Sequence, residues 1–225
     1  EFIGEIYQLG EGVTTDSMGS SVHVGDRVVA PYYITCKNCP MCKIGRYDLC
    51  ENAYIHLGSS PDQWPYFGGT FASHYYIYPE QEFYKVPDDV PNELAVGANC
   101  AFSQVYYGLD RASLVSGETL LIQGAGGLGL YASAIAKEKG AKVIIIDTVS
   151  ERLETAKKFG ADYVINASET TLEEREALVK EYTEGKGPEA ALEVTGFAGA
   201  FEEGIHHLAI MGRYIVIGIN STGVS

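Results

Sequence analysis

Residues 119–129 read TLLIQGAGGLG, and this stretch decides the fold of the second half of the chain. The apolar run 119–123 is typical of a buried strand, and the residues that follow the glycines have the spacing of a helix. Gly124 permits a tight turn, Gly126 lets the backbone approach a pyrophosphate, and Gly129 lets the helix pack closely on the strand. A glycine turn of this kind also occurs without a ligand, so the turn alone leaves a purely structural interpretation open.

A carboxylate follows the next apolar run. Residues 142–146 end in Asp147, at about the distance from the glycine turn where an acid accepts hydrogen bonds from an adenosine ribose. It would repel a 2′-phosphate by ~4 kcal/mol at 4 Å and intermediate dielectric, which favours NAD over NADP. The backbone at Gly127 and Leu128, where the helix begins, supplies amide donors for the pyrophosphate. Arg152 is a candidate for the adenine side, although a solvated helix charge explains it equally well.

The second half of the chain alternates apolar strands with helix-compatible stretches, which is typical of an α/β fold with a doubly wound parallel sheet. Six strands are usual in such a sheet, and five are visible. The expected strands are 119–123, 142–147, 163–166, 190–194 and 214–219. The expected helices are 128–139, 150–159, 171–183 and 198–210.

The first half of the chain has a different pattern. It is rich in glycine, proline and aromatic residues and contains short alternating runs at 27–30 and 71–78. Such runs predict strands of a small all-β domain. We therefore expect two domains, residues 1–102 and 103–225.

Four cysteines stand within fifteen positions: Cys36, Cys39, Cys42 and Cys50. One loop with this spacing can present four thiolates to a tetrahedral ion, and four thiolates leave no open position for a substrate, so the spacing predicts a structural zinc site. Two disulfides or an iron–sulfur cluster are the alternatives. Disulfides need an oxidising compartment, which nothing else in the sequence indicates. Without metal, we expect the loop to lose its order.

Composition narrows the possible partners. The 225 residues carry 16 Lys and Arg against 30 Asp and Glu, a formal net charge of −14. Such a surface repels phosphate backbones and anionic lipid, which argues against nucleic-acid and membrane partners. We find no secretory signal and no apolar run long enough to cross a bilayer, so we expect a cytoplasmic protein. The first residue is not Met and both ends adjoin apparent strands, so we expect part of a longer protein.

The residues VGDRV at 24–28, the four cysteines, the glycine turn and Asp147 occur in the order found in the zinc-containing medium-chain dehydrogenase/reductase superfamily. The chain resembles that superfamily over essentially its whole length. The resemblance implies a chaperonin-10-like barrel followed by a Rossmann domain that is incomplete at its C-terminus. It also implies NAD, one structural and one catalytic zinc, and a homodimer or homotetramer.

The resemblance implies further site residues. Cys100 matches a ligand of the catalytic zinc, although a lone cysteine is more often an inert core thiol. Glu1 matches the acid of the family's Gly-His-Glu triplet, which places the histidine one residue before this chain. Thr195 and Ile217 stand at the ends of strands that face the nicotinamide, and strand packing is their alternative interpretation.

The implied activity is hydride transfer between an alcohol and NAD. A zinc-independent quinone or enoyl reductase is one alternative, but such relatives usually lack both Cys100 and the four metal-type cysteines. A non-catalytic NAD-binding protein is another alternative, and binding of NAD without turnover would identify it. The sequence does not name the alcohol.

Overall fold

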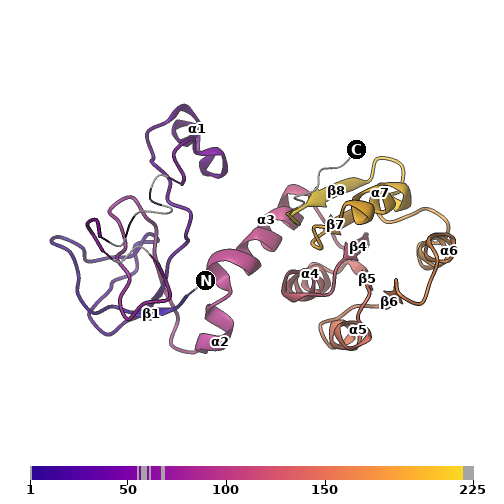
Figure 1. Ribbon diagram of the computed structural model, residues 1–225, viewed down its shortest axis with the longest axis horizontal. Coiled ribbons are helices and arrows are strands. Elements are labelled where there is room, and N and C mark those ends of the chain that lie inside the picture. Colours follow the sequence, from indigo (N-terminus) through magenta and orange to yellow (C-terminus); the bar gives the residue numbers. More distant parts are fainter. Residues whose placement is uncertain (1, 55, 57–59, 61, 67–68, 220–225) are drawn as a thin grey trace. The chain divides into compact units, whose positions relative to one another are not determined.

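The computed structural model describes residues 2–54, 56, 60, 62–66 and 69–219. The chain divides into two compact units, Glu1–Cys100 and Ala101–Ser225 (Figure 1). Within the described ranges, no helix is both long and apolar enough to cross a membrane.

The first unit contains a small antiparallel sheet with the strand order β1-β2-β3. Val28 in the middle strand pairs with Gly4 on one side and Lys85 on the other. Ile6, Val22 and Val28 form a buried apolar cluster beside the sheet. The elements of this unit are β1 (Gly4–Glu5), β2 (Arg27–Val29), α1 (Pro40–Lys43), the 3-10 turn η1 (Tyr47–Leu49), β3 (Tyr84–Lys85) and α2 (Asn92–Ala95), and the π-turn η2 (Ala98–Phe102) follows at the boundary with the second unit.

The strand predicted at 71–78 is wrong, because none of these residues lies in a strand. Their aromatic side chains find partners without one. The ring of Tyr75 lies 4.7 Å from the ring of Phe2, and the ring of Tyr76 lies 5.1 Å from that of Trp64. Alternation specifies which side chains share a face, but it does not supply a partner for the backbone.

The second unit is a parallel sheet with helices on both faces, which confirms the predicted α/β class. The strand order is β6-β5-β4-β7-β8. The strands are β4 (Thr119–Gln123), β5 (Lys142–Asp147), β6 (Tyr163–Asn166), β7 (Ala190–Glu193) and β8 (Arg213–Val216).

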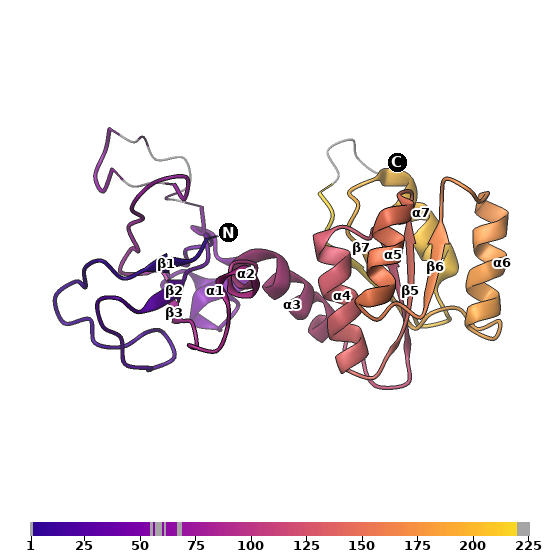
Figure 2. The ribbon, with the colours of Figure 1, turned by 90° about the horizontal axis from the view of Figure 1, so that it is seen from below.

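Two apolar layers hold the helices on this sheet. Helices α3 (Ser103–Arg111), α4 (Gly127–Glu138) and α5 (Ser150–Lys158) contribute to one buried cluster with Leu120, Ile122, Val143 and Ile145. Helix α6 (Leu172–Tyr182) packs on the other face against Leu121, Ile144 and Ile165, and α7 (Ala198–His207) lies beside it (Figure 2).

Several predicted boundaries shift by a few residues. The helix predicted at 198–210 ends at His207, because Leu208 takes an extended ψ of 144°. The helix predicted at 171–183 starts after Thr171, whose hydroxyl accepts a hydrogen bond from the Glu174 amide in a capping box. The strand predicted at 214–219 is β8, which begins and ends earlier than predicted.

The strand order places a topological switch point between β4 and β7. From β4 the chain proceeds outward through β5 and β6, and then returns to the other side of β4 with β7 and β8. In open parallel sheets, ligands bind outside the carboxyl ends of the strands at such a point. The glycine turn leaves β4 at this end of the sheet.

An ion-pair network joins α6 to α7. Arg175 donates to both carboxylate oxygens of Glu203 over 2.7 and 2.8 Å, and His207 Nε2 lies 3.3 Å from Glu203 Oε1. Burial opposes the charge of Glu203, but the hydrogen bonds from Arg175 and His207 outweigh it and lower its pKa from 4.5 to about 2. The folded-state pKa is lowered, so this stabilisation is fully present above about pH 4.5 and is lost as the pH falls towards 2.

Glu203→Gln is therefore expected to lower the free energy of unfolding by about 2–4 kcal/mol at neutral pH, since it leaves Arg175 with a weaker partner. Urea unfolding at neutral pH and near pH 4 measures the effect, and the gap between wild type and variant should narrow at the lower pH. Glu154→Gln is the control, because Glu154 forms an exposed pair with Lys157 and should change stability by less than about 0.5 kcal/mol. If the two substitutions lowered the free energy of unfolding equally, the larger stabilisation that we assign to the Glu203 network would be contradicted.

Candidate cofactor and metal sites

The glycine turn closes tightly between β4 and α4. Gly124 has a φ of +108°, which favours glycine, and a Cβ there would lie 3.0 Å from Thr195 Cγ2. A Cβ on Gly129 would lie 1.9 Å from the carbonyl oxygen of Gly124, so only glycine lets α4 approach the strand this closely. Around Gly126 and Gly127, by contrast, a Cβ would meet nothing within 4 Å. The turn is thus closed on the protein side and open where α4 begins.

Asp147 ties the end of β5 to this turn. Its side chain is almost fully buried, Oδ2 accepts a hydrogen bond of 2.7 Å from the Ala125 amide, and Oδ1 accepts one of 2.9 Å from the Val149 amide. A carboxylate has about four acceptor positions, so two remain for a ligand. Arg152 Nη1 lies 3.9 Å from Oδ2, and most of the Arg152 side chain is exposed. The structure therefore brings Asp147, Arg152 and the glycine turn together.

The two residues expected on the other side of the switch point differ in their surroundings. Thr195 follows β7, and its methyl group is the atom that a Cβ on Gly124 would meet first. Ile217 follows β8, and its side chain packs against the apolar layer that includes Leu109 and contacts Gly108 of α3.

Glu193, the last residue of β7, was not among the residues predicted for this site. It is 2% exposed, and its Oε1 accepts hydrogen bonds from the Thr195 amide at 2.6 Å, the Thr195 hydroxyl at 2.5 Å and the Gly196 amide at 2.7 Å. A charged residue inside the apolar run 190–194 was the available signal, because buried carboxylates require partners.

The four cysteines of the first unit converge. Their sulfur atoms all lie within 4.8 Å of one another, and Cys39, Cys42 and Cys50 are buried. Four sulfurs about 2.3 Å from a zinc ion stand about 3.8 Å apart in a tetrahedron, and the Cys36 and Cys50 sulfurs are 3.6 Å apart. That distance is far longer than a disulfide bond, and all five cysteines of the chain are free thiols. The geometry fits a bound zinc.

Local donors act unequally on these thiols. A hydrogen bond from the Asn52 side chain is the largest of several that lower the pKa of Cys36 to about 6, and the amides of Cys42 and Glu51 lower that of Cys39. Burial raises the pKa of Cys42 to about 12. Since the protein alone does not favour four thiolates, a central cation is the natural partner that would deprotonate all of them.

Cys100 lies apart from this group. It is half-buried in η2, and the preceding Asn99 donates to the carbonyl oxygens of Phe2 at 3.2 Å and Ala30 at 2.9 Å, which fixes the segment to the first unit. In the part of the chain that the structure describes, no group of three metal ligands includes Cys100. Glu1 lies outside the described residues.

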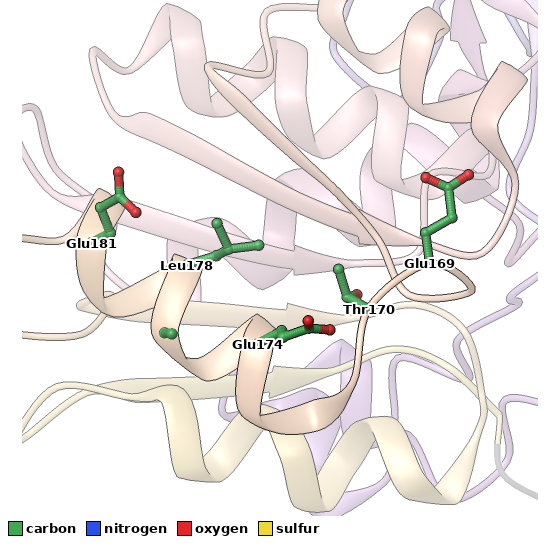
Figure 3. A pocket seen from close by; sticks show the side chains of 6 residues that line it. Glu169, Thr170, Glu174, Leu178 and Glu181 are labelled. Carbon is green, nitrogen blue, oxygen red and sulfur yellow. The ribbon is translucent and has the colours of Figure 1, made fainter.

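A shallow hollow lies elsewhere, beside α6 on the edge of the sheet that ends in β6. Figure 3 shows its lining, which consists of Glu169, Thr170, Glu174, Ala177, Leu178 and Glu181. Glu174 accepts from the Thr171 amide to cap the helix. Three of its six lining residues are glutamates and none belongs to the glycine turn, so we assign it no role in cofactor binding.

The fold and these sites define a class of protein with two parts. One is an α/β unit of the kind that binds dinucleotides, and the other is a β unit with a loop of four cysteines that can hold a metal. Residues 127–225 match the family described as zinc-binding dehydrogenase, and residues 1–88 match the alcohol dehydrogenase GroES-like domain. The chain belongs to the zinc-dependent medium-chain dehydrogenase/reductase superfamily, as the resemblance predicted.

Individual relatives support this family membership. The chain is 34% identical over 97% of its length to 5-exo-hydroxycamphor dehydrogenase of Pseudomonas putida, and 36% identical over 97% to L-threonine 3-dehydrogenase of Pyrococcus horikoshii. It spans 60% and 58% of those two proteins. The crystal structure of an alcohol dehydrogenase from Thermotoga maritima superimposes with a TM-score of 0.91 at 31% identity, covering 99% of this chain and 62% of that one.

Proposed function

We propose that the protein is a zinc-dependent oxidoreductase that transfers a hydride between an alcohol and NAD, giving an aldehyde or ketone. The observation that carries the proposal is the glycine turn at the switch point, closed onto Asp147 at the end of the neighbouring strand. Together with membership of a dehydrogenase superfamily, this geometry supports a nicotinamide dinucleotide as the ligand.

Different residues of the second unit bind different parts of this cofactor. The backbone of the turn at Gly124, Gly126, Gly127, Leu128 and Gly129 receives the pyrophosphate at the N-terminus of α4, where amide donors are free of helix partners. Asp147 accepts from the ribose hydroxyls and Arg152 borders the adenine. Thr195 and Ile217 border the nicotinamide half. NAD, when bound, supplies the hydride acceptor, and the chain supplies its orientation.

The cysteines that we assign to zinc all lie in the first unit. Cys36, Cys39, Cys42 and Cys50 hold a structural zinc, and Cys100 is one ligand of a catalytic zinc whose other ligands lie outside the described residues. A catalytic zinc, when bound, lowers the pKa of a coordinated hydroxyl group towards neutrality.

We place the domains at residues 1–102 and 103–225. We further propose a cytoplasmic homodimer or homotetramer with no nucleic-acid or membrane partner.

The test is reduction of NAD in the presence of a panel of alcohols, followed by the absorbance of the reduced nicotinamide. L-threonine and a hydroxycamphor belong in the panel, because relatives of the chain are named for them. Aliphatic and aromatic primary alcohols complete it. Turnover with an alcohol supports the proposal. Binding of NAD without turnover of any alcohol would favour the non-catalytic alternative, and reduction of quinones or enoyl substrates by NADH would favour the zinc-independent reductase.

Asp147→Asn is expected to reduce the preference for NAD over NADP by up to about a thousandfold, since it removes the charge that repels a 2′-phosphate by ~4 kcal/mol. The amide oxygen of the new side chain can still accept one of the two backbone hydrogen bonds, so the fold should survive. Titration of the reduced cofactors, followed by their fluorescence, measures the two dissociation constants. An unchanged ratio would show that Asp147 does not face the ribose.

A further inference from the structure

The switch point contains a buried carboxylate to which no cofactor contact has been assigned. Glu193 accepts its three hydrogen bonds from two consecutive residues, Thr195 and Gly196, in the turn that follows β7. Burying a carboxylate is unfavourable unless such donors compensate for the lost water. Because all three donors belong to one turn, the carboxylate fixes the shape of that turn.

The same carboxylate also contacts the next turn. A Cβ on Gly218 would lie 2.3 Å from Glu193 Oε2, and the amides of Ile217 and Gly218 donate to the backbone carbonyl of Glu193 at 3.0 and 3.1 Å. Gly196, with a φ of +71°, lies close to the backbone of Ile219. Glu193 thus lies where the turns after β7 and β8 meet.

These contacts decide which groups the turn presents to a ligand. The Thr195 hydroxyl donates to Glu193 and accepts a hydrogen bond of 3.0 Å from the Phe197 amide, so its single O–H donor is used within the protein. The Thr195 and Gly196 amides are likewise directed at the carboxylate. The Thr195 methyl group is left facing Gly124 across the switch point.

Dinucleotides bind across such a switch point, with one nucleotide on each side. Asp147 marks the β5 side as the adenosine side, so the turns after β7 and β8 border the nicotinamide half. We infer that Glu193 is a positioning residue for the nicotinamide half of the cofactor: it holds the Thr195–Gly196 turn in the shape that borders the ring. This inference rests on the proposed function.

The experiment compares NAD with ADP-ribose, which lacks only the nicotinamide, by calorimetric titration of the 225-residue chain. In Glu193→Gln we expect the affinity for NAD to fall about tenfold, the scale of one lost charge-assisted hydrogen bond, while the affinity for ADP-ribose changes by less than about twofold. A merely structural role would weaken both ligands together.

Two substitutions of Thr195 form a matched pair in case Glu193→Gln folds poorly. Thr195→Val keeps the methyl group but removes the hydroxyl that Glu193 holds, and it should weaken NAD selectively. Thr195→Ser keeps the hydroxyl that Glu193 holds and should lose less NAD affinity than Thr195→Val. Unchanged NAD affinity in Glu193→Gln and Thr195→Val, or equal losses for both ligands, would overturn the inference. If wild type binds neither ligand, the proposed function itself fails, and the inference fails with it.

Discussion

Gly129→Ala is expected to abolish NAD binding and to lower the free energy of unfolding by about 3 kcal/mol or more. The reason is geometric: the added Cβ would stand 1.9 Å from the carbonyl oxygen of Gly124 and 2.9 Å from its carbonyl carbon. Both atoms are backbone, so neither can rotate away as a side chain would. The start of α4 has to move off β4, and the amide donors of the turn move with it. Urea unfolding and NADH fluorescence titration measure the two effects.

Gly126→Ala is the matched control. A Cβ at Gly126 would meet nothing within 4 Å, and no positive φ is required there. Stability should stay within about 1 kcal/mol of wild type, since only the N-cap preference changes. Affinity for NAD should nevertheless fall at least about tenfold, because the methyl group occupies the space through which a pyrophosphate approaches the backbone. Normal NAD affinity in this variant would show that the pyrophosphate does not lie at the turn, whatever Gly129→Ala does.

The strands of the second unit could be predicted because buried parallel strands are apolar throughout and are separated by helices that end at glycines. Their ends were less predictable. The run 190–194 looks uniform apart from Glu193, yet the strand ends at that residue, where its side chain accepts hydrogen bonds from the turn. Helix α3 was not predicted, because only two of its three buried residues, Val105 and Leu109, carry large apolar side chains, which is too few to give a clear period before the first strand.

The first unit was harder to predict for a different reason. Its sheet is built from strands of two or three residues that are far apart in sequence, and a pattern of two residues carries no period. The run 71–78 has the better alternation and forms no strand. The convergence of the four cysteines, in contrast, was predictable, since their spacing limits them to one loop. The unequal surroundings of the thiols were not predictable, because Asn52 reaches Cys36 only after the loop has folded.

Cys42→Ser is expected to remove one zinc per chain and to lower the free energy of unfolding by about 5 kcal/mol, a fraction of the binding energy that structural zinc sites supply. Cys42 is buried and lies in α1, so its sulfur cannot be replaced by a neighbour or by water. The loop packs mainly through the cysteines themselves, Ala53 and partly buried Tyr33 and Met41, which is too small an apolar cluster to stay ordered alone. Elemental analysis and thermal unfolding, each with and without a chelator, measure both effects.

The chelator and Cys100→Ala distinguish the alternatives at this loop. A chelator should destabilise wild type but leave Cys42→Ser unchanged, because that variant has no zinc in the loop to lose. Cys100→Ala should keep the stability that this zinc gives, since Cys100 is not among the four converging sulfurs. Zinc is counted in the full-length protein, because the other expected ligands of the catalytic zinc lie outside the described residues. A fall from two zincs in wild type to one in Cys100→Ala would assign the second zinc to that thiol, whereas one zinc in both wild type and variant would favour the zinc-independent reductase. Iron in place of zinc, with the visible absorption of a cluster, would contradict the structural-zinc assignment, because four thiolates bind either metal and only the measured ion separates them.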